Sequence, residues 1–420
     1  MKIIEIQAEE FDNFEKKISN KNFYQTAEYG ALMDRHQFDD YYLGLLDDEN
    51  KIVAATLILV NKVFIGYKWG YCPRGYLIDF YNKELLSIFT ELLKDYLKKR
   101  NFMFIKIDPP IINKSRNNLG EIIDGIDNSN IVENLISLGY EHVGFNLNFE
   151  TLKPRWNAVI NLKDDDVVFK KFNKEKRNKI RKADKLGIEV LQGTPQDIET
   201  FYQFVEEKHS RKLNYYLDMY EVFGKNNMFE IFFSNLNTAK FVEKSKKLYE
   251  NEMTRLNDIN NELEANINAN NTNNIIKRKM HSDKLKNIYE QNLVKATNLY
   301  REFPAGRIIA STAVVKYNKE IFFLIFGYDK EYKSYCPIHY MIYQLIEKYH
   351  KEGYNRFNLN GISGDFNKGS KYYGLTKFKL GFGAEIEEYI GEFNLVINSH
   401  KTSVYKKLNP ILDWLNTPVL

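Results

Sequence analysis

The densest concentration of charge in the sequence lies between residues 170 and 185. This segment, KKFNKEKRNKIRKADK, carries nine lysines or arginines against Glu175 and Asp184, a net charge of +7. Such a density, spread around a helix, suits a polyanion such as RNA. A solvated surface helix is the alternative. If the segment binds RNA, the contacts would come from Arg177, Lys179, Arg181 and Lys182.

Two further residues, Asp108 and Arg74, could contact a charged ligand. Asp108 ends the apolar run FIKID and precedes two prolines, as expected of a buried strand that ends at a functional edge. A carboxylate with an ordinary pKa of about 4 is a poor base for an ammonium group, so we expect Asp108 to orient an amine. Its alternative role is to cap a turn. Arg74, beside Gly75 in YCPRG, could bind phosphate or carboxylate, or could form a structural ion pair.

The elements that must position these residues occur twice. Each set is predicted to contain a β-hairpin, a further strand ending near Tyr-Cys-Pro, an amphipathic helix and a buried strand. Asp108 and Asn360 fall at matching ends of the last strand in each set. The pattern predicts a duplicated α/β domain, with chance recurrence of common elements as the alternative. The segments are 41–60, 71–75, 82–100 and 102–110 in the first set, and 307–328, 335–339, 341–353 and 356–362 in the second.

Residues 243–302 differ in character from both sets. Apolar residues recur there every three or four positions, and the asparagine-rich run at 268–274 interrupts them. The pattern predicts an antiparallel pair of helices, each about 35 to 40 Å long. We expect this arm to protrude, because its apolar stripe is too narrow for two helices that pack on a core.

Composition limits the class of protein further. The 420 residues are 44% hydrophobic and 15% aromatic, which predicts a folded protein with more than one globular unit. The net charge is only +4, so any anion site must be local. The absence of a signal peptide and of a membrane-spanning apolar run predicts a cytoplasmic protein. Two cysteines and seven scattered histidines predict two reduced, partly buried thiols and no catalytic metal.

Over nearly its full length the chain resembles the Fem family of aminoacyltransferases, which build the interpeptide bridges of peptidoglycan. The resemblance implies an α/β (α+β) fold of two acetyltransferase-like (GNAT-like) domains with an inserted antiparallel coiled-coil hairpin. The implied units are 1–150, 151–242 with 303–396, the arm 243–302, and a C-terminal tail helix at 397–420. The segments that carry the resemblance are YQTAEYGALM (24–33), YCPRGYLIDF (71–80), FIKIDPP (104–110), RNKIRKADKLGIEV (177–190), NLNGISGDF (358–366) and LTKFKLGFGAEIEEYIGEF (375–393).

The resemblance also implies the reaction and its partners. An amine of the third stem-peptide residue would attack the ester carbonyl of a charged tRNA and so acquire glycine, alanine or serine. The acceptor would be the lipid-linked precursor lipid II or the soluble UDP-MurNAc-pentapeptide. No cofactor beyond the aminoacyl-tRNA co-substrate is implied. The remaining expectations are peripheral contact with the inner face of the membrane and pairing with a second copy or a sister enzyme.

Acyl transfer of this kind needs a neutral amine and stabilisation of an oxyanion. The resemblance places the cation of Lys379, next to Phe378, against the developing negative charge or the tRNA terminus; an exposed lysine in an alternating strand is the alternative. The family's diphosphate-binding lysine has no direct counterpart here, and Arg35 is the nearest cation; for the family's arginine before the next helical region, Arg211 and Lys212 are near but do not align. The other residues expected at the substrates are Gly75, Tyr335, Asn360, Gly361 and Lys377, with Lys246 and Lys247 of the arm at the tRNA.

Two other functions stay open at this point. An acyl-CoA-dependent N-acyltransferase of the same fold would need a phosphate-binding loop of the type Gln/Arg-x-x-Gly-x-Gly/Ala at a helix N-terminus, and neither half contains one. A non-catalytic binding or immunity protein would have no need of Asp108, Phe378 and Lys379, which are all present.

Overall fold

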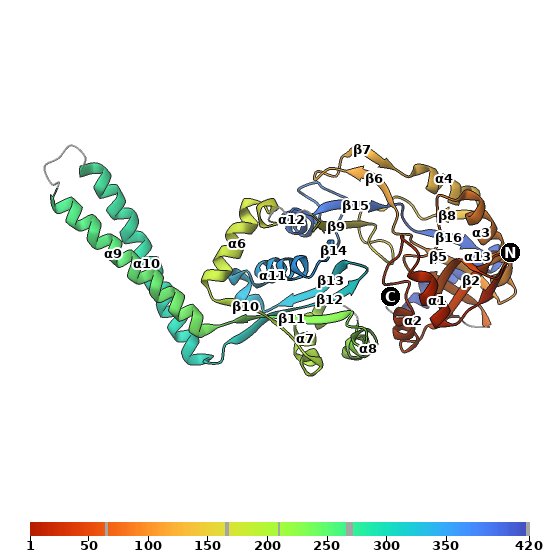
Figure 1. Cartoon of the computed structure of the whole chain (residues 1–420), viewed down its shortest axis with the longest axis horizontal. Coiled ribbons are helices and arrows are strands. Elements are labelled where there is room, and N and C mark those ends of the chain that lie inside the picture. The colour runs from red at the N-terminus through yellow and green to blue at the C-terminus, as the bar shows by residue number, and fades with distance from the viewer. Residues whose placement is uncertain (64–65, 164–167, 209–210, 266–271, 417–420) are drawn as a thin grey trace.

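The structure is a computed structural model that describes residues 1–63, 66–163, 168–208, 211–265 and 272–416. Two β-sheets with their flanking helices lie side by side along the long axis, and a helical arm extends from the second of them (Figure 1). This agrees with the predicted mixed α/β fold class. Within the described ranges, no helix is long and apolar enough to cross a membrane.

The first sheet has seven strands in the order β1-β2-β3-β4-β5-β16-β8. All neighbours pair antiparallel except β4 and β5, which are parallel and connected by α3. Asn82 caps α3 by accepting a hydrogen bond from the backbone N–H of Leu85 (3.0 Å), and the apolar face of the helix is buried. The elements are β1 (Lys2–Glu5), β2 (Asp39–Leu46), β3 (Ile52–Lys62), β4 (Lys68–Cys72), β5 (Phe102–Ile107), β16 (Phe393–Val396), β8 (Tyr140–His142), α1 (Ala8–Glu15), α2 (Ala27–Asp34), α3 (Lys83–Lys98) and α4 (Ser129–Ser137).

The second sheet has nine strands in the order β10-β11-β12-β13-β14-β9-β15-β6-β7. Only β13 and β14 are parallel among the described pairs, and α11 connects them. The strands are β10 (Ile188–Gln192), β11 (Phe229–Leu236), β12 (Arg307–Tyr317), β13 (Glu320–Tyr328), β14 (Arg356–Gly361), β9 (Trp156–Asn161), β15 (Glu385–Tyr389), β6 (Ile112–Arg116) and β7 (Ile122–Asp127). The helices are α5 (Val168–Lys171), α6 (Lys174–Lys185), α7 (Ile198–Val205), α8 (Leu213–Gly224), α11 (Pro337–Lys351) and α12 (Tyr373–Leu380), with short 3-10 helices at Pro195–Asp197, Glu206–Lys208 and Lys330–Tyr335. The C-terminal helix α13 (Ser399–Asn416) packs on β5 of the first sheet, where Thr402 Oγ1 donates to the backbone oxygen of Met103 (2.9 Å).

The order β1-α1-α2-β2-β3-β4-α3-β5 is repeated as β10-α7-α8-β11-β12-β13-α11-β14. The duplication is therefore present, and Asp108 and Asn360 lie at equivalent strand ends, but the two copies align differently from the prediction by one strand. Cys72 ends β4, whereas Cys336 caps α11 in the left-handed region (φ 60°), so β13 is the equivalent of β4. The repeated Tyr-Cys-Pro misleads because Pro337 starts a helix, where its missing N–H needs no partner.

The two halves of the chain exchange strands. β6 and β7 come from the first half and extend the second sheet beside β15, while β16 comes from the end of the second half and completes the first sheet between β5 and β8. The predicted unit boundaries at 150 and 396 therefore cut across both sheets. Periodicity predicts a strand but not its partner, so this exchange could not be predicted from the sequence.

One hydrophobic core joins the two halves. It contains residues of α1, α2 and β3 from the first half and of α7, α8, β11, β12 and β13 from the second. The ring centroid of Phe23 lies 4.9 Å from that of Phe322 and 6.3 Å from that of Phe223. Because the halves share this core, a cavity between them has walls of fixed relative position.

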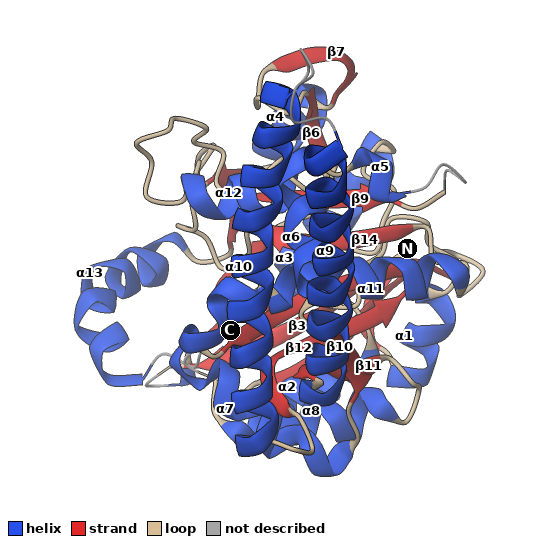
Figure 2. Cartoon of the chain, turned by 90° about the vertical axis from the view of Figure 1, so that its left-hand side faces the viewer, coloured by secondary structure: helices blue, strands red, loops and turns tan. Residues whose placement is uncertain are grey.

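The arm consists of α9 (Thr238–Ala265) and α10 (Thr272–Glu302), which run side by side in Figures 1 and 2. Phe241 and Ala296 anchor its base in a small core, and further out Ser282 donates a hydrogen bond to Glu252 (2.5 Å) between the helices. α9 begins before the predicted start at 243 because its first turn belongs to this core. The predicted turn at 268–274 falls partly outside the described residues, and Thr272 already belongs to α10.

Both cysteines are buried free thiols, as predicted. The segment expected to form a tail helix contains α13 (Ser399–Asn416), and residues 417–420 lie outside the described ranges.

Candidate functional site

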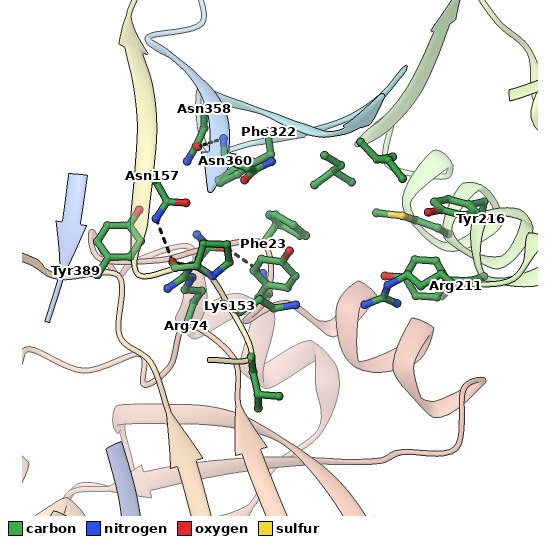
Figure 3. Close-up of a pocket in the computed structure, with 18 residues that line it drawn as sticks. Phe23, Arg74, Lys153, Asn157, Arg211, Tyr216, Phe322, Asn358, Asn360 and Tyr389 are labelled. Carbon is green, nitrogen blue, oxygen red and sulfur yellow. Dashed lines mark hydrogen bonds between the residues drawn. The ribbon is translucent and has the colours of Figure 1, made fainter. Parts of the chain in front are cut away.

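Two cavities have β13 in their walls. The central cavity lies between the two halves and has a volume of about 240 Å³; Figure 3 shows the residues that line it. The helical cavity lies between α6, the start of α11 and α12, and has a volume of about 470 Å³. Leu324 and Ile325 line the central cavity, and Phe326 and Tyr328 line the helical cavity. One strand therefore contributes consecutive residues to two separate spaces.

Arg74 lines the central cavity and is held by Asp108. The backbone N–H of Arg74 donates to Asp108 Oδ1 (2.7 Å), its Nη1 lies 3.3 Å from Oδ2, and its Nη2 donates to the backbone oxygen of Pro154 (2.8 Å). The guanidinium also lies over the ring of Tyr389, 4.8 Å from its centroid. Arg74 therefore forms the structural ion pair that was one of its two expected roles. Because its side chain also lines the cavity, the pairing does not exclude the other role, binding of a phosphate or carboxylate.

Asp108 lies behind Arg74 and is not among the described residues that line either cavity. It is 3% exposed. Burial raises the pKa of Asp108 to about 6, and the opposing effects of the Arg74 guanidinium and backbone N–H only limit this rise. In this position Asp108 fixes Arg74, so it would reach a ligand in the central cavity only through Arg74.

Lys153 and Arg211 bring two further cations to the central cavity (Figure 3). Lys153 Nζ lies 4.1 Å from the centroid of the Tyr24 ring, and the Arg211 guanidinium carbon lies 3.8 Å from that of Tyr215. Within the described chain, neither cation forms an ion pair. Burial, and then the charge of Arg211, lower the pKa of Lys153 to about 7. The cavity therefore carries uncompensated positive charge and suits an anion.

Side-chain amides line another part of the central cavity, near Tyr389 (Figure 3). The backbone N–H of Asn360 donates to Asn358 Oδ1 (2.8 Å), and Asn360 Nδ2 donates to the backbone oxygen of Phe323 (2.8 Å). Asn360 has a left-handed backbone (φ 59°), which asparagine tolerates better than most residues. With Asn157 of β9, these amides offer donors and acceptors of the kind that a peptide needs.

The helical cavity combines aromatic side chains with cations. Lys176 is 3% exposed, its Nζ lies 4.6 Å from the centroid of the Phe378 ring, and it forms no ion pair within the described ranges. Burial, and then the charge of Lys179, lower the pKa of Lys176 to about 8. His339 meets Phe378 edge-on (5.2 Å between centroids), and burial lowers its pKa to about 3. Aromatic rings and cations at the start of a helix suit the base and phosphate of a nucleotide.

Lys379 is not in the lining of either cavity, but it is connected to residues of both. Its neighbours Lys377 and Phe378 on α12 line the helical cavity, and its Nζ donates to the backbone oxygen of Gly361 (2.7 Å) at the end of β14. Gly361 is packed so closely on Pro154, which lines the central cavity, that a Cβ there would lie 2.6 Å from its ring. Lys379 is 7% exposed, and burial lowers its pKa to about 7. The alternative of an exposed lysine in a strand is therefore wrong.

Four of the expected substrate contacts, Gly361 among them, are not in the lining of either cavity. Arg35 pairs with Glu221 and Asp218 of α8 on the surface (2.8 and 3.0 Å). Tyr335 is buried against Tyr332 near the base of the arm, and Gly75 packs against the side chain of Gln25. The structure brings Arg74, Arg211 and Asn360 to the central cavity, and Lys377 and Phe378 to the helical cavity.

The residues expected at the tRNA are distributed over α6 and the arm. Arg181 and Lys182 line a groove of about 380 Å³ between α6 and the two arm helices. Lys179 lies on the opposite flank of α6, in the wall of the helical cavity. α6 therefore connects the helical cavity with the arm by a row of cations. Of the others, Arg177 donates to the backbone oxygen of Lys170 (3.3 Å), Lys246 lies 3.8 Å from Glu250, and Lys247 is exposed.

Lys153 and Lys176 are the site residues that sequence reasoning missed. Lys176 was hidden in a run of lysines, and Lys153 in the segment TLKPRW that joins the two halves. Neither position carries a motif. A lysine whose charge is buried without a partner is visible only once the fold is known.

The duplicated α/β fold thus has two cavities on one strand, one lined by cations and amides and the other by aromatic rings and cations, and so offers space for two ligands. The chain belongs to the FemAB family, whose model matches residues 6–409. It is 26% identical over 427 residues to aminoacyltransferase FemA of Staphylococcus epidermidis, covering 98% of this chain and 100% of that protein. It is 25% identical over 429 residues to FemA of Staphylococcus aureus (strain MRSA252), covering 98% and 99%. The crystal structure of FemX superimposes with a TM-score of 0.75 at 21% identity, over 97% of this chain and 100% of that chain.

Proposed function

We propose that the protein is an aminoacyltransferase that moves glycine, alanine or serine from aminoacyl-tRNA to the stem-peptide amine of a peptidoglycan precursor. The observation that carries this proposal is the pair of cavities that share β13, which would hold an acceptor and a donor against one strand. Membership of the FemAB family and the likeness to FemA over the whole chain support the transferase class. We further propose that the protein acts in the cytoplasm, where charged tRNA is found.

The donor is assigned to the helical cavity. The terminal adenosine of the tRNA would lie against Phe378, and its phosphates would face Lys176, Lys179 and the start of α11. The preceding nucleotides would follow the cations of α6 towards the arm. An acyl-CoA donor is less well served, because residues 334–337 at the start of α11 read Ser-Tyr-Cys-Pro and contain no glycine that would let phosphates approach the backbone.

The acceptor is assigned to the central cavity. Its peptide would bind the amides of Asn157, Asn358 and Asn360, and its anionic groups would face the cations at the other part of the cavity. Both lipid II and UDP-MurNAc-pentapeptide carry phosphate and a peptide carboxylate, so either satisfies this chemistry. The amine would then reach the donor ester near Gly361 and Lys379.

In the reaction the neutral amine attacks the ester carbonyl, and the carbonyl oxygen becomes an oxyanion. As the tetrahedral intermediate collapses, the bond to the tRNA ribose oxygen breaks, an amide is formed, and the proton lost by the amine goes to the departing oxygen. We assign the stabilisation of the oxyanion to Lys379 and the positioning of Arg74 to Asp108. In this scheme the amino acid is never bonded covalently to the enzyme.

We expect transfer from charged tRNA and none from acetyl-CoA. The purified protein would be incubated with UDP-MurNAc-pentapeptide or lipid II as the acceptor. The donor would be a mixed pool of charged tRNAs in one reaction and acetyl-CoA in another, and the products would be weighed by mass spectrometry. A mass increase of one glycine, alanine or serine residue supports the proposal and identifies the amino acid. Acetylated product with no aminoacyl product would instead favour the acyl-CoA alternative, and no product with either donor would favour a binding protein.

Shortening the arm should weaken binding of tRNA and leave binding of the precursor intact. Replacing residues 253–281 by a short Gly-Ser linker joins α9 and α10 where Glu252 and Ser282 already meet (2.5 Å), so the base of the arm keeps its contacts. The change removes Arg255, Lys277, Arg278 and Lys279. We expect the affinity for charged tRNA to fall about tenfold, with a weaker dependence on salt. Filter binding at two salt concentrations measures both; unchanged tRNA affinity would assign the arm to a protein partner such as a second copy.

A further inference from the structure

We propose that Lys153 is an anion anchor of the central cavity, whose ammonium binds a phosphate or carboxylate oxygen of the acceptor together with Arg211. This inference rests on the proposed function, because it takes the acceptor to occupy the central cavity. It assigns to Lys153 the role for which the sequence offered only Arg35. Arg35 is committed to Glu221 and Asp218 outside the cavity.

The backbone on both sides of Lys153 is fixed by hydrogen bonds. Its own carbonyl oxygen accepts from Thr151 Oγ1 (2.8 Å), and the next carbonyl, that of Pro154, accepts from Arg74 Nη2 (2.8 Å) and Asn157 Nδ2 (3.2 Å). The aliphatic stem is buried, and the ammonium lies over the ring of Tyr24. Lys153 is therefore held in the cavity wall and does not sample the surface freely.

The other positive charges differ in how much binding capacity they have left. Arg74 already contacts the carboxylate of Asp108 and the carbonyl of Pro154. Lys153 lies over the ring of Tyr24 and Arg211 over that of Tyr215, and neither forms an ion pair within the described residues; the carboxylate of Asp108, which attracts Lys153, is already paired with Arg74. A buried cation without a counter-charge destabilises the fold unless a ligand compensates it. The pair Lys153 and Arg211 is thus the part of the cavity that an anion would complete.

Anion binding at Lys153 has a measurable signature in protons. The charged and titratable groups that face Lys153 are Arg211, Arg74, Asp108 and Tyr24. Because burial and Arg211 lower the pKa of Lys153 to about 7 in the empty cavity, most of the side chain is neutral at pH 8. An anion beside it favours the ammonium form, so binding at pH 8 should take up close to one proton, and binding at pH 6 should take up very little.

The test is calorimetric titration of the full-length protein with UDP-MurNAc-pentapeptide and, separately, with the free pentapeptide. Each titration is done at pH 6 and at pH 8. The titration at pH 8 is done once in HEPES and once in Tris, because the difference in binding heat between the two buffers reports the number of protons taken up. Wild type is compared with Lys153→Met, Lys153→Arg and the exposed control Lys99→Met. Thermal unfolding of each variant verifies that it folds.

We expect Lys153→Met to weaken binding about tenfold or more at pH 7. Lys153→Arg, which stays charged, should bind within threefold of wild type but without proton uptake at pH 8, and Lys99→Met should match wild type. Uptake with the UDP-linked precursor alone would assign the anion to the diphosphate, and uptake with both probes would assign it to the peptide carboxylate; both results support the anchor. Binding by Lys153→Met within twofold of wild type, or unchanged proton uptake in Lys153→Arg, would overturn it. If wild type bound neither probe, the placement of the acceptor in the central cavity would fail first, and the anchor with it.

Discussion

Replacing Lys379 by methionine is expected to slow aminoacyl transfer by roughly 100-fold, or about 3 kcal/mol in the barrier. Methionine keeps much of the apolar stem, but it removes the cation assigned to the oxyanion and leaves the carbonyl of Gly361 without its donor. Single-turnover rates with pre-charged tRNA measure the effect directly. Binding of the precursor should change far less, because stabilisation of a transition state appears in the rate.

The pH dependence separates a chemical role of Lys379 from a structural one. Burial lowers the pKa of Lys379 to about 7, so the cation is present below pH 7 and is lost as the pH rises above it. The ratio of wild-type to Lys379→Met rates should therefore be largest near pH 6 and should shrink towards pH 9. Lys368→Met, an exposed lysine in the loop before α12, is the matched control. A ratio below threefold at pH 6, or one that does not vary with pH, would place the chemistry elsewhere.

Glu388→Gln is expected to lower the free energy of unfolding by about 3 kcal/mol or more. Glu388 of β15 is 2% exposed and pairs with Arg155, which immediately precedes β9, and with Arg116 of β6 (Nε to Oε2, 2.6 Å). Glutamine keeps the shape but removes the only negative charge that compensates the buried guanidinium of Arg155 within the described chain. Chemical unfolding in urea would measure the loss.

The size of this effect depends on burial, which a matched pair of variants can verify. Glu49→Gln breaks the exposed pair between Glu49 and Lys51 and should change stability by less than about 0.5 kcal/mol. The double variant Glu388→Gln with Arg155→Met removes both buried charges and should recover part of the loss. If the double variant were less stable than Glu388→Gln alone, the packing of Arg155 would matter more than its charge.

The sequence predicts the parts of this molecule that depend on local patterns. The amphipathic helix at 82–100, both hairpins and the arm all follow from spacing, and Asp108 and Asn360 occupy the strand ends where they were expected. The alignment of the two copies was wrong by one strand, because the same tripeptide ends a strand at Cys72 and caps a helix at Cys336.

Site residues whose role depends on long-range packing could not be predicted in the same way. Arg35 stands close in sequence to the first cavity residues, but the packing of α2 on α8 directs it to Glu221. Lys153 stands in a connecting segment with no pattern, yet the meeting of the two halves buries it in the central cavity. The chemistry of this cavity arises from the interface between the halves, and only the fold specifies that interface.

The exchange of β6, β7 and β16 between the sheets limits which segments of this chain could be replaced by the corresponding segments of a relative. A segment cut at residue 150 would leave the first sheet without the strand that separates β5 from β8, and the remainder would lose the strand that pairs with β15. A chimaera that takes one half from a relative would therefore have to carry the crossing strands with it, or rebuild their pairing with foreign neighbours. We therefore expect that half-chain exchanges would disturb folding and that substrate preference cannot be moved with one half. Exchanges that still fold should be confined to loops, cavity residues and the arm.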